Sequence, residues 1–341
     1  MVRVLQAMAG ATHGGAEAFF TRLVVALGRA GLEQRAVIRR HEERSSALRH
    51  AGIDVKEVRF GGPLDIRSGL GLRREIERFR PHVVLSWMNR ATRSCPRGDF
   101  VHCARLGGYY KLKHYKRCDH LIGNTRGIVD YLVDQGWPAD RAHYLPNFVT
   151  AERAAPVSRA SLETPDNAPL LLALGRLHDN KGFDVLIEAM AALPEAWLWL
   201  AGSGPLDKVL KDQAQRRGVA SRIRFLGWRD DVALLLAAAD IFVCSSRLEP
   251  LGNVVLEAWA HDVPVVATDH AGPAELISDG KDGLLVPVED APALATAIGR
   301  IVSDDALAGA LAKAGRTTYE ANYTEAAVVR CYLDFFAKVA A

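Results

Sequence analysis

Short apolar runs separated by helical patterns extend along the chain, and they constrain its fold more than any other feature. In the second half such runs lie at residues 170–174, 197–201, 223–226, 241–244, 263–267 and 284–286. They are continuously apolar rather than alternating, which is typical of strands in a parallel sheet covered on both faces. Helical patterns lie between them, so this half predicts a doubly wound α/β domain.

The first half repeats this organisation. Strand-like runs lie at residues 2–7, 34–39, 55–60, 83–88, 100–105 and 120–124, with helical patterns between them, notably over 17–30 and 70–79. Residues 151–169 contain three prolines and little periodicity, which is typical of a linker. We therefore expect two Rossmann-like domains facing across a cleft, at 1–150 and 168–319. A helical segment over about 320–341 is expected to pack back on the first domain.

Charge divides the chain in the same place. Residues 1–150 contain 25 Lys and Arg against 14 Asp and Glu, a balance of +11, whereas the net charge of the whole chain is only +3. A basic half suggests an anionic partner, namely nucleic acid, anionic lipid or a phosphorylated glycan. The alternative is an arginine-rich composition inherited from a GC-rich genome. No nucleic-acid motif accompanies the basic residues, so nucleic acid is not expected as a partner.

Other general features point to a cytosolic protein. No apolar run approaches the ~20 residues that span a membrane. The chain enters a strand-like run at Val2, without the pattern of a signal peptide. Its five cysteines are an odd number without metal-site spacing, which favours reduced thiols.

Two cations follow the first strand of the second half, in the segment 175–182. Arg176 and Lys181 would lie at a strand end where a helix begins, which is an arrangement suited to a pyrophosphate. The alternative is a pair of ordinary surface cations. The turn 202–205, which includes Gly204, resembles part of a dinucleotide fingerprint, but position 207 is Asp where the third glycine would stand. This argues against a dinucleotide site, and the alternative is a tight strand-to-helix turn.

Two segments of the first half are also candidates. Gly15 lies in a glycine pair before a helix, where backbone amides can approach an anion closely. Residues 105–117 are rich in cations and tyrosines, including Arg105, Lys111 and Lys113. This stretch suits a phosphorylated or sugar-bearing acceptor or an anionic membrane surface, and a solvated basic face is the alternative.

Glu249 and Glu257 are the candidate functional carboxylates of the second half. A fully helical span of eight residues would place them about 12 Å apart. Paired carboxylates of glycoside hydrolases are closer, at roughly 5–9.5 Å, and the longer distance is about that from ribose to sugar in a nucleotide-sugar. The alternative is two solvated helix carboxylates. The chain has no D-x-D motif, so we expect a metal-free site in which Arg176, Lys181 and helix amides neutralise a leaving diphosphate.

Taken in order, these segments resemble those of the retaining GT-B glycosyltransferases of family 4. The matching stretches are Gly-Gly-Ala-Glu at 14–17, Gly-Arg-x4-Lys-Gly at 175–182, Gly-Ser-Gly-Pro at 202–205, Phe-Leu-Gly at 225–227 and the two glutamates of 249–257. Within the family, Arg-Leu-Gly-Gly-Tyr-Tyr at 105–110 is most similar to transferases of lipopolysaccharide-type surface glycans.

The resemblance implies a role for each matching residue. For the donor these are Arg176 and Lys181 on the diphosphate, Glu257 on the ribose, Glu249 at the transferred sugar, the amides of Leu251, Gly252 and Asn253 on sugar and phosphates, Leu226 and Gly227 at the base, and Gly204 and Gly15 near the donor. The implied acceptor residues are His102, Arg105, Lys111 and Lys113. Many relatives carry a histidine after the middle strand of the first domain. His102 is the candidate here, although Arg105 and two glycines occupy that segment.

The implied activity is hexosyl transfer from a nucleotide-sugar to a glycan or lipid-linked acceptor, with retention of configuration. No cofactor is expected besides the nucleotide-diphosphate sugar, which is a co-substrate. The expected place of action is the cytoplasm, including the inner face of the inner membrane, with an anionic membrane surface as a further partner. Alternatives are a nucleotide-sugar epimerase, a phosphorylase, a dehydrogenase and a non-catalytic glycan-binding module.

Overall fold

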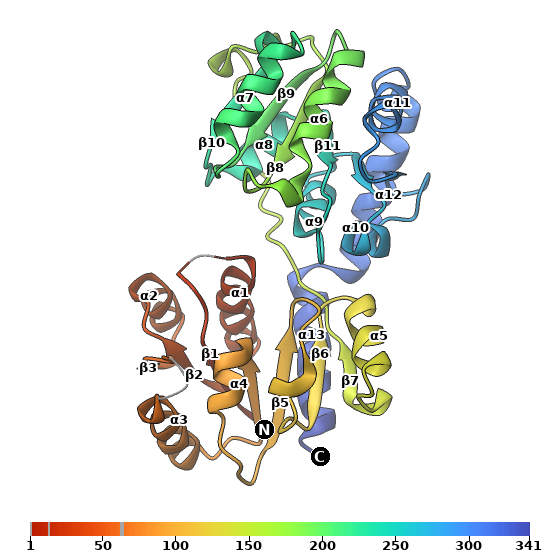
Figure 1. The fold of residues 1–341 in the computed structure, drawn as a ribbon. Helices are drawn as coiled ribbons and strands as arrows, with labels where there is room; N and C mark the ends of the chain where they lie inside the picture. The colour runs from red at the N-terminus through yellow and green to blue at the C-terminus, as the bar shows by residue number, and fades with distance from the viewer. Residues whose placement is uncertain (1, 13, 62–64) are drawn as a thin grey trace. The chain divides into compact units, whose positions relative to one another are not determined.

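The computed structural model describes residues 2–12, 14–61 and 65–341. The chain divides into two compact units (Figure 1), of which one comprises Met1–Phe148 and Glu325–Ala341 and the other Val149–Thr324. Each unit is built on a single parallel sheet, as the apolar runs predict. The fold class expected from the sequence is therefore confirmed.

The sheet of the first unit has the strand order β3-β2-β1-β4-β5-β6-β7. Its strands are β1 (Arg3–Met8), β2 (Glu33–Arg39), β3 (Asp54–Val58), β4 (Val83–Trp87), β5 (Val101–Leu106), β6 (His120–Gly123) and β7 (Ala142–Tyr144). Its helices are α1 (Gly15–Arg29), α2 (Glu42–His50), α3 (Ile66–Phe79), α4 (Met88–Ser94), α5 (Arg126–Asp134) and α13 (Glu325–Val339), with 3-10 turns at Leu112–His114 and Ala139–Arg141. Thr125 caps α5 through its hydroxyl at 3.1 Å from the Ile128 amide, as predicted.

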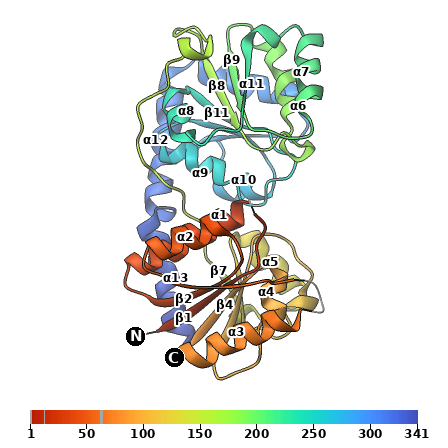
Figure 2. The ribbon, with the colours of Figure 1, turned by 90° about the vertical axis from the view of Figure 1, so that its left-hand side faces the viewer.

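The two faces of this sheet have separate cores. Val4 of β1 packs with Phe20 of α1 on one face, and the next residue, Leu5, packs with Leu72 of α3 on the other. Successive side chains of a strand point to opposite faces, so a short strand supplies both cores. Figure 2 shows α1 and α2 on one side of these strands and α3 on the other.

The last helix, α13, completes the first unit although it is distant in sequence. Its first residue, Glu325, pairs with Arg29 of α1 at 2.8 Å. Further along the helix, Tyr332 and Phe336 are fully buried in the core shared with α1. The first unit therefore needs both ends of its chain to cover one face of the sheet.

The second unit has the strand order β10-β9-β8-β11-β12-β13. Its strands are β8 (Leu170–Leu174), β9 (Trp197–Ala201), β10 (Ile223–Gly227), β11 (Ile241–Cys244), β12 (Val265–Thr268) and β13 (Leu284–Val286). Its helices are α6 (Phe183–Ala189), α7 (Asp207–Arg216), α8 (Val232–Ala238), α9 (Asn253–Ala260), α10 (Ala271–Leu276), α11 (Ala291–Val302) and α12 (Asp305–Asn322), with 3-10 turns at Ala160–Leu162, Asp179–Lys181, Met190–Ala192 and Ala220–Arg222.

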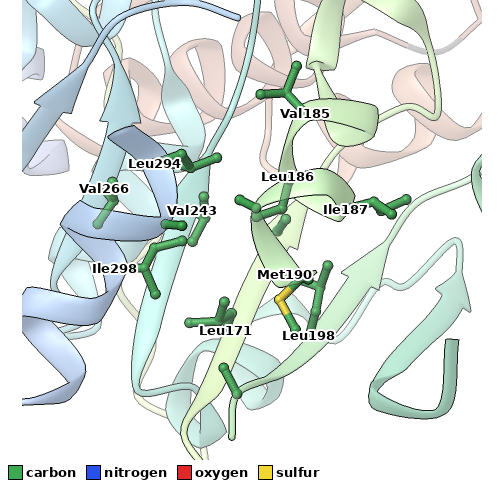
Figure 3. Packing of buried hydrophobic residues seen from close by; sticks show 14 of the residues in the cluster. Leu171, Val185, Leu186, Ile187, Met190, Leu198, Val243, Val266, Leu294 and Ile298 are labelled. Carbon is green, nitrogen blue, oxygen red and sulfur yellow. The ribbon is translucent and has the colours of Figure 1, made fainter. Parts of the chain in front are cut away.

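This sheet is also covered on both faces. Leu171 of β8 packs against Leu186 of α6, with Ile298 of α11 in the same cluster (Figure 3). Its neighbour Leu172 belongs to the opposite core, which contains Trp259 of α9. Burial on both faces explains why the strands of this unit are almost continuously apolar, with Arg224 of the edge strand β10 and Thr268 of β12 as exceptions.

The segment predicted as a linker, residues 151–169, lies within the second unit and is anchored to it. The guanidinium of Arg159 donates to the carbonyl of Ala238 and pairs with Asp240 at 2.8 Å. Further along, the Thr164 hydroxyl accepts from the indole of Trp199 at 2.8 Å. Proline content alone therefore did not reveal that this segment packs on the sheet.

Three histidines of the first unit are expected to make its stability depend on pH. Burial lowers the pKa of His102 to about 4, and burial with the neighbouring His120 lowers the pKa of His143 to about 4. Burial also lowers the pKa of His120. Each histidine binds a proton more readily when unfolded. Their contribution is therefore present above about pH 6.5 and is lost as the pH falls toward 4.

We predict that the melting temperature of the protein falls between pH 7 and pH 4.5. The fall should be several degrees smaller in a His120→Gln/His143→Gln variant, because that variant lacks two of the histidines whose protonation destabilises the fold. The carboxylates are the same in both proteins and contribute equally to the fall. A His114→Gln variant is the control, and its pH profile should match that of the unaltered protein. Identical pH profiles for all three proteins would contradict the assignment of this pH dependence to His120 and His143.

Candidate active site

The strand order of the second unit reverses between β8 and β11. In doubly wound sheets, the loops that leave such neighbouring strands diverge, and ligands bind beyond their carboxyl ends. The loop after β8 contains Arg176 and Lys181, and the loop after β11 contains Glu249. Sheet topology therefore brings together residues that are about seventy positions apart in the sequence.

Glycines allow the loops after β8, β9 and β10 to pack side by side. The Gly202 amide donates to the Gly227 carbonyl at 2.7 Å, and a Cβ at Gly202 would lie only 1.7 Å from the Gly175 carbonyl oxygen. Likewise, a Cβ at Gly204 would lie 2.3 Å from the Leu177 carbonyl oxygen. The motif 202–205 is thus required for backbone contact between loops.

Lys181 and Glu249 form an ion pair at this edge of the sheet, through Nζ and Oε2. The two side chains are only 20% and 14% exposed. Burial alone would lower the pKa of Lys181, but the charge and hydrogen bond of Glu249 raise it, with a further contribution from Glu257. The lysine is therefore held in its charged form within reach of both glutamates.

Helix α9 begins directly after the loop that holds Glu249. Gly252 precedes the helix in the left-handed conformation, with φ of 83°, and its amide lies 3.4 Å from Oε1 of Glu249. Asn253 is the first helical residue, so Glu257 lies one turn into the helix. The 12 Å estimate assumed a helix over the whole span. It does not apply, because Glu249 lies outside α9.

Arg247 is a residue of this site that the sequence did not single out. Its guanidinium bonds both carboxylate oxygens of Asp184 at 2.7 and 2.6 Å, pairs with Glu289, and donates to the Asp179 carbonyl at 2.9 Å. The hydrogen bonds of Asp184 and Glu289 raise the pKa of Arg247, and the hydrogen bond of Arg247 lowers the pKa of Glu289. Arg247 thus joins the loops that follow β8, β11 and β13.

Gly272 of α10 is a second residue that sequence reasoning missed. Its amide donates to the Glu249 carbonyl at 3.0 Å. A Cβ there would lie 2.5 Å from that oxygen and 2.7 Å from Cα of Leu251. Any larger residue would therefore push away the loop that carries Glu249.

The other predicted donor residues of this unit lie on the same edge of the sheet. Arg176 is exposed and forms no hydrogen bond or ion pair with any residue that the structure describes. Leu226 and Gly227 end β10, next to the Gly202 turn. The predicted set is contributed by the ends of four strands: Arg176 and Lys181 after β8, Gly204 after β9, Leu226 and Gly227 in β10, and Glu249, Leu251, Gly252, Asn253 and Glu257 after β11.

The predicted residues of the first unit differ in accessibility. Gly15 begins α1, and a Cβ added there would meet no atom within 4 Å. His102 is 4% exposed, and its Nε2 bonds the Ser86 hydroxyl at 2.9 Å inside the core. Arg105 is also buried, whereas Lys111 and Lys113 are exposed. The structure therefore does not bring His102 together with the lysines.

Two further features are absent from the described part of the chain. No group of three or more His, Cys, Asp or Glu side chains in it is arranged to hold a metal ion. None of its helices combines the length and the apolar character needed to cross a membrane.

Solved structures place the fold in the GT-B class of glycosyltransferases. The structure is similar to a glycosyltransferase from Rickettsia africae, with a TM-score of 0.86 and 20% identity over 99% of this chain and 98% of that one. It is also similar to HepE of Anabaena in complex with UDP-glucose, with a TM-score of 0.84 and 19% identity over 99% and 100% of the two chains.

Sequence comparison then defines the family. The family model described as Glycosyltransferase Family 4 matches residues 13–153, and the one described as Glycosyl transferases group 1 matches residues 168–304. The lipopolysaccharide core biosynthesis glycosyltransferase LpsE of Rhizobium meliloti is 40% identical over 95% of this chain and 96% of its own. LpsD of the same organism is 36% identical over 95% of each chain. The chain belongs to the family 4 glycosyltransferases.

We predict that Gly272→Ala lowers glycosyl transfer at least tenfold, because the added methyl group displaces the Glu249 loop. Kinetics of sugar transfer, with the melting temperature measured in parallel, test this. Gly309→Ala is the matched control. Gly309 lies in α12, where an added Cβ would meet no atom within 4 Å, so alanine should leave the rate unchanged and stabilise the helix by about 1 kcal/mol. Equal rates for both variants would contradict the role of Gly272.

Proposed function

We propose that this glycosyltransferase moves a hexose from a nucleotide-sugar to a glycan of the lipopolysaccharide core type, with retention of the anomeric configuration. The observation that carries the proposal is the Lys181–Glu249 pair, with Glu257 in electrostatic reach, at the strand-order reversal of the second unit. The acceptor class is supported by LpsE and LpsD, which are named for lipopolysaccharide core biosynthesis.

The donor is assigned to the loops at the carboxyl edge of the second sheet. Arg176 and Lys181 bind its diphosphate, and Glu257 accepts hydrogen bonds from the ribose hydroxyls. Glu249 faces the transferred sugar. The amides at the start of α9 add donors that suit an anion. A nucleotide-sugar donor is supported by HepE of Anabaena, a structural neighbour described with UDP-glucose.

In the transfer step, the bond between the anomeric carbon and the diphosphate oxygen breaks, and a bond to the acceptor hydroxyl oxygen forms on the same face of the sugar. The acceptor proton passes to the departing phosphate oxygen. Negative charge grows on the diphosphate as it leaves, so fixed cations stabilise the transition state more than the ground state. Arg176 and Lys181 supply this charge without a divalent ion.

We predict that Lys181→Ala and Glu249→Ala each lower the transfer rate by roughly 10²-fold or more, which is the scale of losing one preorganised electrostatic group. Radiolabel transfer to a core glycan acceptor, with UDP-, GDP- and ADP-sugars as donors, measures the effect. Lys208→Ala, which removes an exposed lysine of α7, is the matched control and should leave the rate unchanged.

Because each single variant leaves a buried charge without its partner, stability needs a separate control. The double variant Lys181→Met/Glu249→Gln removes both charges, so it should fold as stably as the unaltered protein and still fail to transfer sugar. Full activity in either alanine variant would remove the proposed site. Proton NMR of the product tests whether the anomeric configuration is retained. Transfer measured in excess chelator tests whether the reaction proceeds without a metal ion.

A membrane-bound acceptor is supported by helix α3 of the first unit. Ile66 and Leu70 are 74% and 50% exposed, and Arg67 and Arg74 are exposed beside them at helical spacing. An apolar stripe flanked by arginines suits the interface of an anionic bilayer. We therefore propose that α3 lies on the membrane surface that holds the acceptor.

We predict binding to vesicles that contain phosphatidylglycerol, with an affinity that falls steeply between 0.05 and about 0.5 M salt because the attraction is screened. Arg67→Gln/Arg74→Gln should weaken binding about tenfold or more, since each arginine near the surface contributes about 1 kcal/mol. Arg216→Gln on α7 is the control. Cosedimentation measures the bound fraction, and binding that is insensitive to both salt and the α3 variant would exclude this surface.

A further inference from the structure

The first unit contains a cavity at its own reversal of strand order, between β1 and β4. The cavity has a volume of about 320 Å³ and is lined by loops that follow three neighbouring strands. Ala9 and Glu17 come from the connection after β1, Arg90 from α4 after β4, and Arg105 and Gly107 from the end of β5 and beyond. The position is the one where doubly wound sheets bind ligands.

Arg105 is a buried cation in the wall of this cavity. It is only 5% exposed, yet no carboxylate lies within ion-pair distance of it in the part of the chain that the structure describes. Its hydrogen-bond partners are neutral: Nε donates to the Tyr332 hydroxyl at 2.9 Å, and Nη2 donates to Asn147. These bonds orient the guanidinium but do not neutralise its charge.

Two aromatic rings complete this setting. The guanidinium carbon lies 4.8 Å from the ring centroid of Phe19 and 4.7 Å from that of Trp87. Such contacts favour a cation and hold it rigidly. Burying a charge without a counter-ion still costs free energy. A positive charge held in this way is thus preorganised for an anion that the chain itself does not supply.

Two of the three guanidinium nitrogens of Arg105 are engaged by Tyr332 and Asn147, which leaves Nη1 for a ligand of the cavity that Arg105 lines. Nη1 has no hydrogen bond to a described residue, and a Cβ built on Gly107, which also lines the cavity, would lie 3.9 Å from it. Arg90, which is exposed, contributes a second cation to the same wall. The acidic lining residue, Glu17, is engaged by the Ala11 amide at 2.7 Å and by the charge of Arg44.

We propose that this cavity binds an anionic substituent of the acceptor glycan, a phosphate or a sugar carboxylate, and that Arg105 selects for it. The inference rests on the proposed glycosyl transfer and specifies its acceptor. It assigns the anion to the acceptor because the donor diphosphate has its own cations, Arg176 and Lys181. Arginine suits the task because its planar fork bonds phosphate and carboxylate groups in pairs.

The test uses binding rather than catalysis, so a failure of sugar transfer does not affect it. Isothermal titration calorimetry at constant ionic strength compares inorganic phosphate, glucose 6-phosphate, glucuronate and neutral glucose. The proteins are the unaltered chain, Arg105→Gln, Arg105→Lys, Arg90→Gln and the surface control Arg78→Gln. An Arg176→Ala/Lys181→Ala variant removes the cations of the donor site.

We expect glucose 6-phosphate or glucuronate to bind at least tenfold more tightly than glucose, and the stronger of the two identifies the substituent. Arg105→Gln should abolish this preference, Arg105→Lys should retain part of it, and Arg90→Gln should weaken it severalfold. Arg78→Gln and the donor-site variant should keep it. Equal binding of charged and neutral sugars, or a preference lost only in the donor-site variant, would overturn the proposal.

Because Arg105 is buried, the melting temperature of its variants is measured alongside. If Arg105→Gln fails to fold, Arg90→Gln decides the question, since the Arg90 side chain is exposed and donates to the Phe60 carbonyl at 3.3 Å rather than to a side chain of the core. An unchanged preference in that variant would then refute an anion site in this cavity.

Discussion

The reversal of strand order in a parallel sheet is the constraint on which both units depend. Where the order reverses, the loops from two adjacent strands leave toward opposite faces and cannot fill the space between them. In the second unit this position lies between β8 and β11 and holds Lys181 and Glu249. In the first unit it lies between β1 and β4 and opens the cavity that Arg105 lines. The same topology thus creates two places where polar side chains gather.

The cations at the two positions differ in the groups that surround them. The ammonium of Lys181 is balanced by the carboxylate of Glu249, and the guanidinium of Arg247 is balanced by Asp184 and Glu289. Arg105 has aromatic rings and neutral acceptors in place of a carboxylate. A buried pair is stable without a ligand, whereas an unbalanced cation gains most when an anion arrives. This contrast, rather than proximity to a motif, distinguishes Arg105 from Lys181 and Arg247.

The sequence predicted what local patterns determine. Continuous apolar runs predicted two parallel sheets, and the glycine-rich segments fell at strand ends as expected. Contacts between distant segments were beyond such reasoning: Arg247 meets Asp184 and Glu289, which lie 63 and 42 residues away. Gly272 likewise matters only because the Glu249 loop packs against it. The strand predicted over 83–88 ends at Trp87, because Met88 takes a positive φ of 69° and turns the chain directly into α4.

Net charge and local charge give different information about such a protein. The second half of the chain is acidic overall, yet its sheet edge presents Arg176 and Lys181. The first half is strongly basic, but most of its arginines are exposed and screened by solvent, and Arg105, which is buried, carries the inference about the acceptor. Electrostatic energy depends on distance and on burial. An anionic substrate is therefore recognised by where the fold holds a few cations, and the overall balance affects chiefly how the molecule approaches charged surfaces.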